Sequence, residues 1–474
     1  GTRALADGAT ATAAGHFRRS VELTRADLAA DRSRRRSRLG RALAPIGGVE
    51  DATAAFESAM DDARVARAAG DHSWRTAFAT AAEALATLLF ERIRFVDAWR
   101  LGDAALEEMG EGDDLDTARV RVARSRGRTG ETNDASGWVA DCERAIEAAR
   151  AAGDADAEYE LRRDLGRARS EAGLATAADW TVLADLARAR GDVAAEVSAR
   201  LMESAYRMDA APAEALALLA PTRELAVARG LVERLGWLDH AAAEAALGAG
   251  EWDMTIEAGL RAATLGERYG YDRISVRSWT ALLPAASLRG EREVLERAEA
   301  WFDARRGRLP DSPYGRVLHA ACGLRIAAGT GRPSEPPDLE HIRPAIGQWI
   351  DQGGFEWLAA TDAILDAWFA DGRLDWVRAL ADADSPRPPI PPSPAQPAGL
   401  ELVRIRLEAA VGEPDRDRVG RTRAVLVAFR SIGLPFWEAR AIRVLEGLGD
   451  AGAAEVGERE AIEARLGVVR PVLQ

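Results

Sequence analysis

Glycines recur at a nearly constant spacing from Gly70 to Gly270, each time after a run rich in Ala, Arg and Glu. The series is Gly70, Gly110, Gly153, Gly191, Gly230 and Gly270, and the successive differences in residue number are 40, 43, 38, 39 and 40. A nearly fixed period of this length is the signature of supersecondary units that stack on one another. The spacing therefore predicts an array of equivalent units rather than one compact core.

Each period contains two segments with a helical pattern of apolar residues. In residues 47–70, Ala52, Phe56, Ala59 and Ala63 recur at three- and four-residue spacings and form one apolar stripe. The glycine after such a segment supplies the left-handed conformation that closes a helix without steric cost. The sequence contains no alternating β-branched stretches flanked by hairpin turns. We therefore predict an all-α fold, an α-solenoid of antiparallel helix pairs with a period of about 40 residues.

The sequence predicts three successive regions. We expect residues 1–330 to form the repeat array. The regular spacing fades after about residue 310, and two proline-rich stretches, 329–344 and 385–397, cannot be helical throughout. Residues 331–397 are therefore expected to form an irregular segment of linkers and short helices. Helical patterns in residues 398–474 predict further helical repeats that cap the array.

Composition excludes several functional classes. The 474-residue chain carries 63 basic residues, all of them arginine, and a formal net charge of −13 at pH 7. Without lysine, a phosphate-binding loop of the GxxxxGK type and Schiff-base chemistry are both excluded. The negative charge argues against nucleic-acid binding. No apolar run could span a bilayer and the first residues lack a signal-peptide core, so a cytoplasmic location without a membrane partner is expected.

No pattern in the sequence indicates catalysis. The five His residues are scattered without metal-ligand spacing, and Cys142 and Cys322 are isolated. Asp61 and Asp62 lack the third carboxylate that the diphosphate–magnesium site of an all-α terpene synthase needs. Tryptophans occur about one per helical segment, which favours bulky core fillers over carbohydrate stacking. We therefore expect no enzyme activity, no metal and no cofactor.

One stretch resembles a known repeat family. The residues that carry the resemblance are Leu39, Gly40, Leu43, Gly47, Ala52, Phe56 and Ala59. This order is similar to the tetratricopeptide pattern, in which the first helix has a large residue before a small one and the second has Ala, an aromatic residue and Ala. The small residues let paired helices approach closely, and Phe56 fills the groove between them. The resemblance implies a right-handed superhelix, although the period here exceeds the 34-residue standard by about five.

The sequence of the whole chain is similar to that of a more particular group of proteins. It resembles the C-terminal repeat region of large bacterial signalling proteins, which join a nucleotide-cyclase or LuxR-type DNA-binding domain to a signalling ATPase. The phrases that carry this resemblance lie at residues 15–24, 41–71, 426–442 and 460–471. It implies a non-catalytic module for protein–protein interaction or effector sensing. Its partners would be a protein or peptide and the upstream signalling domains of the same polypeptide.

The densest charge cluster, residues 31–38, supplies the candidate binding residues. In the tetratricopeptide register its arginines lie on the first helix of a pair and face the concave groove, and two later arginines occupy related positions. The candidates are Arg34, Arg38, Arg41, Arg163 and Arg167. A guanidinium group offers a planar fork to a carboxylate, so we predict a site for an acidic peptide. The alternative is a solvated helix face with ion pairs inside the helix.

Two other functions are compatible with an all-α chain of this length. One is a small-molecule sensor, such as the sugar-binding repeat domain of a transcriptional activator, which requires a Trp-lined pocket between helices. The other is an enzyme built on an all-α toroid that processes glycans. That enzyme would need converging carboxylates inside a closed ring.

Overall fold

The computed structural model describes residues 1, 10–46, 48–92, 94–110, 112–132, 134–305, 313–333, 336–340, 355–382, 394–413 and 417–469. In this part of the chain the regular structure consists of α-helices and one short 3-10 helix, without a strand. The prediction of an all-α fold is confirmed. None of the helices in the described ranges combines the length and apolar character that a membrane crossing requires.

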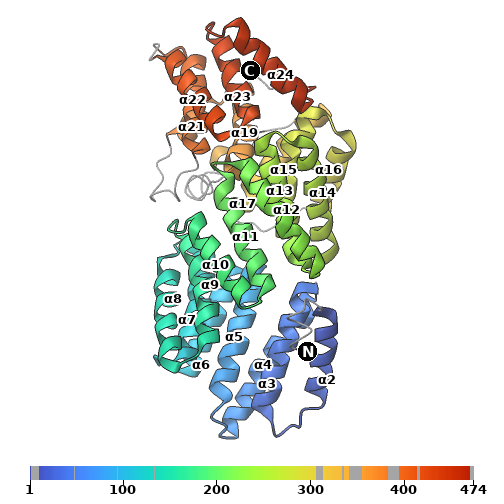
Figure 1. Cartoon of the computed structure of the whole chain (residues 1–474), viewed down its shortest axis with the longest axis vertical. Helices are drawn as coiled ribbons and strands as arrows, with labels where there is room; N and C mark the ends of the chain where they lie inside the picture. The colour runs from blue at the N-terminus through green and yellow to red at the C-terminus, as the bar shows by residue number, and fades with distance from the viewer. Residues whose placement is uncertain are drawn as a thin grey trace. The chain divides into compact units, whose positions relative to one another are not determined.

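The chain divides into two compact units. Unit 1 comprises Gly1–Glu196, Leu225–Glu233 and Tyr269–Tyr271, and unit 2 comprises Val197–Glu224, Arg234–Arg268 and Asp272–Gln474. The helices of unit 1 (Figure 1) are α2 (Thr10–Glu22), α3 (Ala29–Leu43), η1 (Ala44–Ile46), α4 (Val49–Ala68), α5 (Trp74–Glu91), α6 (Phe95–Met109), α7 (Leu115–Thr132), α8 (Ser136–Ala152), α9 (Ala155–Glu171) and α10 (Ala177–Ala189).

The remaining helices belong mostly or wholly to unit 2. They are α11 (Val193–Met208), α12 (Pro212–Ala228), α13 (Val232–Ala249), α14 (Trp252–Tyr269), α15 (Asp272–Arg289), α16 (Arg292–Ala304), α17 (Pro313–Thr330), α19 (Phe355–Ala370), α20 (Leu374–Ala381), α21 (Ala395–Ala410), α22 (Arg418–Ile432), α23 (Pro435–Gly447) and α24 (Ala453–Leu466). The proline-rich stretches 329–344 and 385–397 lie partly outside the described residues, and from Ala395 onward the second stretch is helical.

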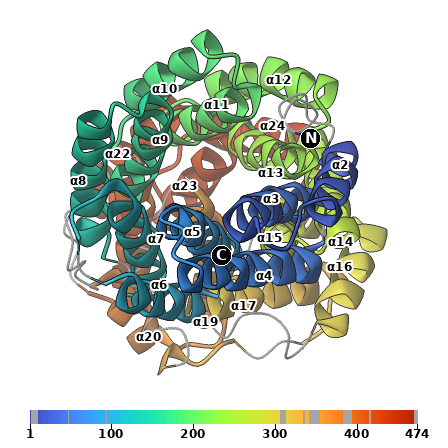
Figure 2. The ribbon, with the colours of Figure 1, turned by 90° about the horizontal axis from the view of Figure 1, so that it is seen from below.

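Unit 1 has two layers of helices. Each helix from α2 to α10 packs against the next helix along the chain, and α5 also contacts both α3 and α7. Figure 2 shows α3, α5 and α7 on one side, which we call the inner layer, and α4, α6 and α8 on the other, the outer layer. Extensive contacts between successive members occur in the inner layer, so it forms the concave side of the unit. Unit 2 follows the same plan, because α17 contacts α15 and α19, and α19 contacts α21.

The six glycines of the period close the second helix of each pair. Each has a positive φ, between 65° and 77°. Gly153 ends α8, and its N–H donates to the carbonyl oxygens of Ala149 and Arg150. Asp154, the next residue, begins α9 because its carboxylate accepts from the N–H of Ala157 at 2.9 Å. Glycine and aspartate together therefore make this sharp connection between one pair and the next.

The period continues beyond the end of this glycine series. Glycines with positive φ also occur at the ends of first helices. Five of them, Gly250, Gly290, Gly331, Gly372 and Gly412, form a second regular series, and their residue numbers differ by 40, 41, 41 and 40. The expectation that the regular spacing fades after residue 310 is therefore wrong. This second series closes first helices, whereas Gly433 and Gly467 close the second helices α22 and α24. A search for one type of cap misses the other.

The helix-pair packing expected from the tetratricopeptide pattern is present in α3 and α4. A Cβ atom placed on Gly40 would lie 2.6 Å from the ring of Phe56. The Phe56 side chain is 2% exposed and fills the space that the missing side chain leaves. Most tryptophans expected in the core are there too: the buried ones are Trp138, Trp180, Trp252, Trp279 and Trp301, whereas Trp74 and Trp99 are half-buried.

Replacing Gly40 by Ala is expected to destabilise unit 1 by about 1–3 kcal/mol, because the added methyl group overlaps the Phe56 ring. Urea denaturation followed by circular dichroism measures the change. The matched control is Gly15→Ala in α2, where a Cβ would meet nothing within 4 Å. That change should be neutral or stabilise by up to about 1 kcal/mol, because alanine is the better helix former. Equal effects of the two substitutions would contradict the packing.

Candidate functional site

Most arginines of the predicted cluster on α3 are engaged inside unit 1. Arg32 and Arg36 both pair with Asp62 of α4, each at 2.7 Å, and the Asp62 carboxylate is buried. Arg34 pairs with Asp31 one helical turn earlier. These contacts join the two helices of one pair or link neighbouring turns of one helix. For Arg34, the structure therefore matches the alternative of an ion pair inside the helix.

Arg38 and Arg41 differ from these neighbours. Both side chains are exposed, and over the described residues neither makes a hydrogen bond or an ion pair. They are three residues apart on α3, so they share one face of the helix with Arg34. Because α3 belongs to the inner layer, unit 1 carries two unpaired cations on an inner-layer helix.

Elsewhere in the inner layer, polar and charged side chains pair between successive helices. Arg119 of α7 donates to Glu83 of α5 at 3.1 Å and to Glu160 of α9 at 2.9 Å. Thr76 of α5 donates to Asp116 of α7 at 2.7 Å. The partners in these contacts are 36 to 41 residues apart in sequence, about one repeat. The attraction of Glu83 raises the pKa of Arg119. We call this set of contacts the inner-layer ladder.

Arg163 and Arg167 of α9 are not equivalent to Arg38 and Arg41. Arg163 lies 3.5 Å from Asp192 and 5.7 Å from the centre of the Tyr159 ring. Arg167 is also engaged in an interaction and is not free. Two inner helices, α5 and α7, separate α9 from α3 along the array. The structure therefore does not bring the five predicted arginines into one site.

A second candidate site, missed at the level of sequence, lies in the interior of unit 2. Three arginines and two aspartates from four helices meet there: Arg325 of α17, Asp362 and Asp366 of α19, Arg406 of α21 and Arg440 of α23. We call this group the buried charge cluster. Asp366 accepts two hydrogen bonds from Arg440, at 2.8 and 2.9 Å, and one from Arg406 at 3.1 Å. The sequence signal for this group was a pair of aspartates four residues apart in a mainly apolar helix.

The two aspartates of this cluster have different environments. Burial opposes ionisation of Asp366, but the attraction of Arg440 and Arg406 prevails and lowers its pKa to about 2. Burial also acts on Asp362, and there it prevails, so the pKa of Asp362 is raised. The nearest guanidinium nitrogen to Asp362, on Arg440, lies 3.4 Å from Oδ2. Asp366 is therefore a fully paired carboxylate and Asp362 a weakly paired one.

A small pocket adjoins the buried charge cluster. Its polar wall consists of Asp362, Arg406 and Arg440, and the rest of its lining is mainly apolar. Its open space of about 10 Å³ corresponds to one water molecule. The pocket can hold a single small group and is too small for a sugar ring.

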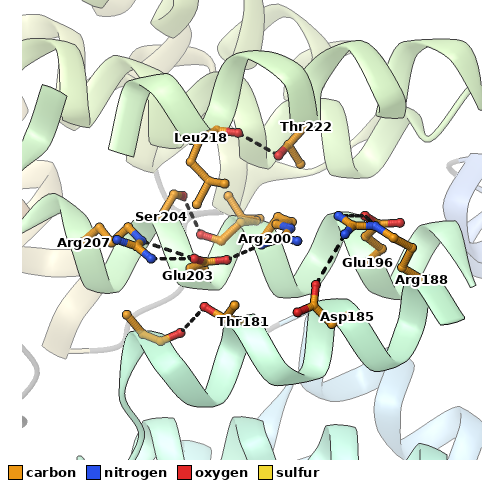
Figure 3. Close-up of polar contacts among 12 residues, drawn as sticks. Thr181, Asp185, Arg188, Glu196, Arg200, Glu203, Ser204, Arg207, Leu218 and Thr222 are labelled. Carbon is orange, nitrogen blue, oxygen red and sulfur yellow. Dashed lines mark hydrogen bonds and ion pairs between the residues drawn. The ribbon is translucent and has the colours of Figure 1, made fainter. Parts of the chain in front are cut away.

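Arginine–carboxylate pairing is widespread outside these two sites. Figure 3 shows Arg188 with Glu196 in unit 1, at 2.6 Å. In unit 2 the same figure shows Glu203 between Arg200 and Arg207, at 2.8 and 2.9 Å. Over the described ranges, no group of three or more His, Cys, Asp or Glu is arranged to hold a metal ion. A paired arginine in this chain is therefore an ordinary structural element.

Comparisons with known proteins add little to this description. No family model matches the chain, and no curated protein matches it. Among solved structures the chain is similar to a circular tandem repeat protein with novel repeat topology and enhanced subunit contact surfaces. The two share 16% sequence identity over 97% of this chain and 95% of that one, with a TM-score of 0.12. A TM-score of this size does not establish a shared fold.

Proposed function

We propose that the chain is a non-catalytic helical-repeat scaffold, and that the inner face of α3 in unit 1 binds an acidic protein or peptide segment. The observation that carries the proposal is the contrast on α3: Arg32, Arg34 and Arg36 are paired with carboxylates, whereas Arg38 and Arg41 are exposed and unpaired within the described residues. Exposed guanidinium groups on a concave helical surface favour a ligand that supplies carboxylates.

The inner-layer ladder supports a helical form for that ligand. Along the array, an inner helix presents charges to the next inner helix, as Arg119 does to Glu83 and Glu160. A partner helix with carboxylates three or four residues apart would meet Arg38 and Arg41 in the same manner, because those spacings place side chains on one face. We therefore favour an acidic amphipathic helix over an extended acidic segment.

The biological setting of this scaffold is proposed on the sequence resemblance alone. The tetratricopeptide-like sequence pattern favours a cytoplasmic bacterial signalling or transcription regulator. In such a protein, upstream domains would respond when the acidic partner binds. The pocket in unit 2 does not support the sugar-sensor alternative, because its 10 Å³ of open space cannot hold a sugar. The weakly paired Asp362 beside the fully paired Asp366 does not support glycan hydrolysis, which requires two available carboxylates.

The test is a charge reversal on α3. The probe is a fluorescent synthetic alanine-based helix with glutamate at every fourth position, titrated with the full chain at low salt. The double variant Arg38→Glu/Arg41→Glu is expected to weaken binding at least about tenfold, because two attractive charges become repulsive. Added salt should weaken binding to the wild-type chain.

The matched control is Arg100→Glu on α6. Arg100 is also exposed and without a partner in the described part of the chain, but it lies on the outer layer. Its reversal changes the net charge without altering the proposed site, so the affinity for the probe should stay within about twofold. Failure of the wild-type chain to bind, or an equal loss in the control, would contradict the proposal.

A further inference from the structure

The buried charge cluster of unit 2 has an excess of positive charge. It contains three guanidinium groups and two carboxylates, and four of the five residues are at most 8% exposed. The two carboxylates cannot neutralise all three arginines, even when both are ionised.

Arg325 is the arginine that the cluster leaves uncompensated. Its Nε and Nη2 atoms are buried and have no hydrogen-bond partner in the structure as described. Burial lowers the pKa of Arg325, but a guanidinium group stays protonated in proteins. A buried charge without a counter-charge is strongly destabilising, so a group of opposite charge near the cluster would be strongly favoured.

The pocket beside the cluster provides the place for such a group. Arg406 and Arg440 form its cationic wall, and Oδ2 of Asp362, 3.4 Å from an Arg440 nitrogen, accepts no hydrogen bond within the described ranges. The space admits one group of about the size of a water molecule or a halide ion. A water molecule would satisfy hydrogen bonds but not the excess charge.

We propose that this pocket holds one small monovalent inorganic anion of the size of chloride, which neutralises the excess guanidinium charge of the buried cluster. Arg406 and Arg440 line the pocket and hold the anion directly. Arg325 lines a different part of the interior and acts through its charge. The anion site is independent of the acidic-helix site on α3, since the two lie in different units.

Bromide is the probe, because its anomalous scattering distinguishes it from water. Crystals of the full chain grown or soaked in sodium bromide should show an anomalous peak beside Arg406 and Arg440. In solution, the thermal midpoint should rise with bromide concentration by several degrees more than with gluconate at equal ionic strength. Water in the pocket without an anomalous peak would overturn the proposal, as would identical effects of the two salts.

Two substitutions shift the effect in opposite directions. Arg325→Met leaves two arginines against two aspartates, so the bromide-specific rise in midpoint should disappear although the pocket lining is intact. Asp362→Asn removes a carboxylate and keeps the shape, so the rise should reach its half-maximum at a lower bromide concentration. A surface control in the same unit, Arg423→Met, should leave the bromide effect unchanged, because Arg423 pairs with Asp450 and Glu455. If Arg325→Met does not fold, Asp362→Asn alone decides: an unchanged or weaker bromide response overturns the proposal.

Discussion

Replacement of Asp366 by Asn is expected to lower the free energy of unfolding of unit 2 by about 3–5 kcal/mol. The Asp366 carboxylate accepts two hydrogen bonds from Arg440 and one from Arg406 in the interior of the unit. The neutral amide keeps the size of the side chain but removes the carboxylate that pairs with both guanidinium groups. Urea denaturation of the full chain, followed by circular dichroism, measures the loss.

The pH dependence of stability provides a second measure of the same contact. The folded pKa of Asp366, about 2, lies below the value near 3.9 of an unfolded aspartate. A lowered folded pKa contributes stability that is complete above about pH 4 and is lost as the pH falls through 2. For Asp366 this contribution is about 2–3 kcal/mol. The Asn variant should lose this part of the acid sensitivity.

The control for this experiment lies at the end of the same helix. Asp371 follows α19 and pairs with Arg373 at 2.8 Å, with both side chains about half exposed. Its replacement by Asn should cost less than about 1 kcal/mol, because exposed ion pairs contribute little. Similar losses for the Asp366 and Asp371 variants would show that burial and double pairing do not matter here.

The features of this fold that were predictable from sequence are set by residues close to one another along the chain. The glycines with positive φ at Gly70 and Gly153 close helices because only local backbone sterics decide that conformation. Gly40 and Phe56 lie on two consecutive helices, and the tetratricopeptide-like pattern of this helix pair predicts their contact. The glycine caps of the second regular series, such as Gly290 and Gly331, were missed because they close first helices rather than second ones.

The candidate sites were less accessible to sequence reasoning, because pairing across helices decides which charges are free. The pair of Arg34 with Asp31 is visible in sequence, since three-residue spacing brings the two side chains together. The pairing of Arg32 with Asp62 is not visible, because the partner lies 30 residues away on the next helix. Arg440 and Asp366 are separated by 74 residues, so only the tertiary fold of unit 2 brings them together.

Replacement of Phe56 by Ala is expected to destabilise unit 1 by about 3–5 kcal/mol. The Phe56 ring is 2% exposed and fills the groove between α3 and α4 at Gly40. Its removal leaves a cavity between α3 and α4, because the surrounding helices relax only partially into the space of the lost ring. A substitution at an exposed position of the same helix, Val65→Ala, should change stability by less than about 0.5 kcal/mol, since Val65 is 51% exposed.

The double variant Gly40→Ala/Phe56→Ala tests whether the two residues are coupled. In the Phe56→Ala background, the methyl group added at position 40 no longer meets the ring atom that lies 2.6 Å from the ideal Cβ position. It instead occupies part of the cavity, and alanine favours the helix more than glycine does. Gly40→Ala should therefore change from destabilising to neutral or stabilising, with a coupling energy of about 1–3 kcal/mol. Additive losses would mean that Phe56 and Gly40 act independently, and that the close approach of α3 and α4 has another cause.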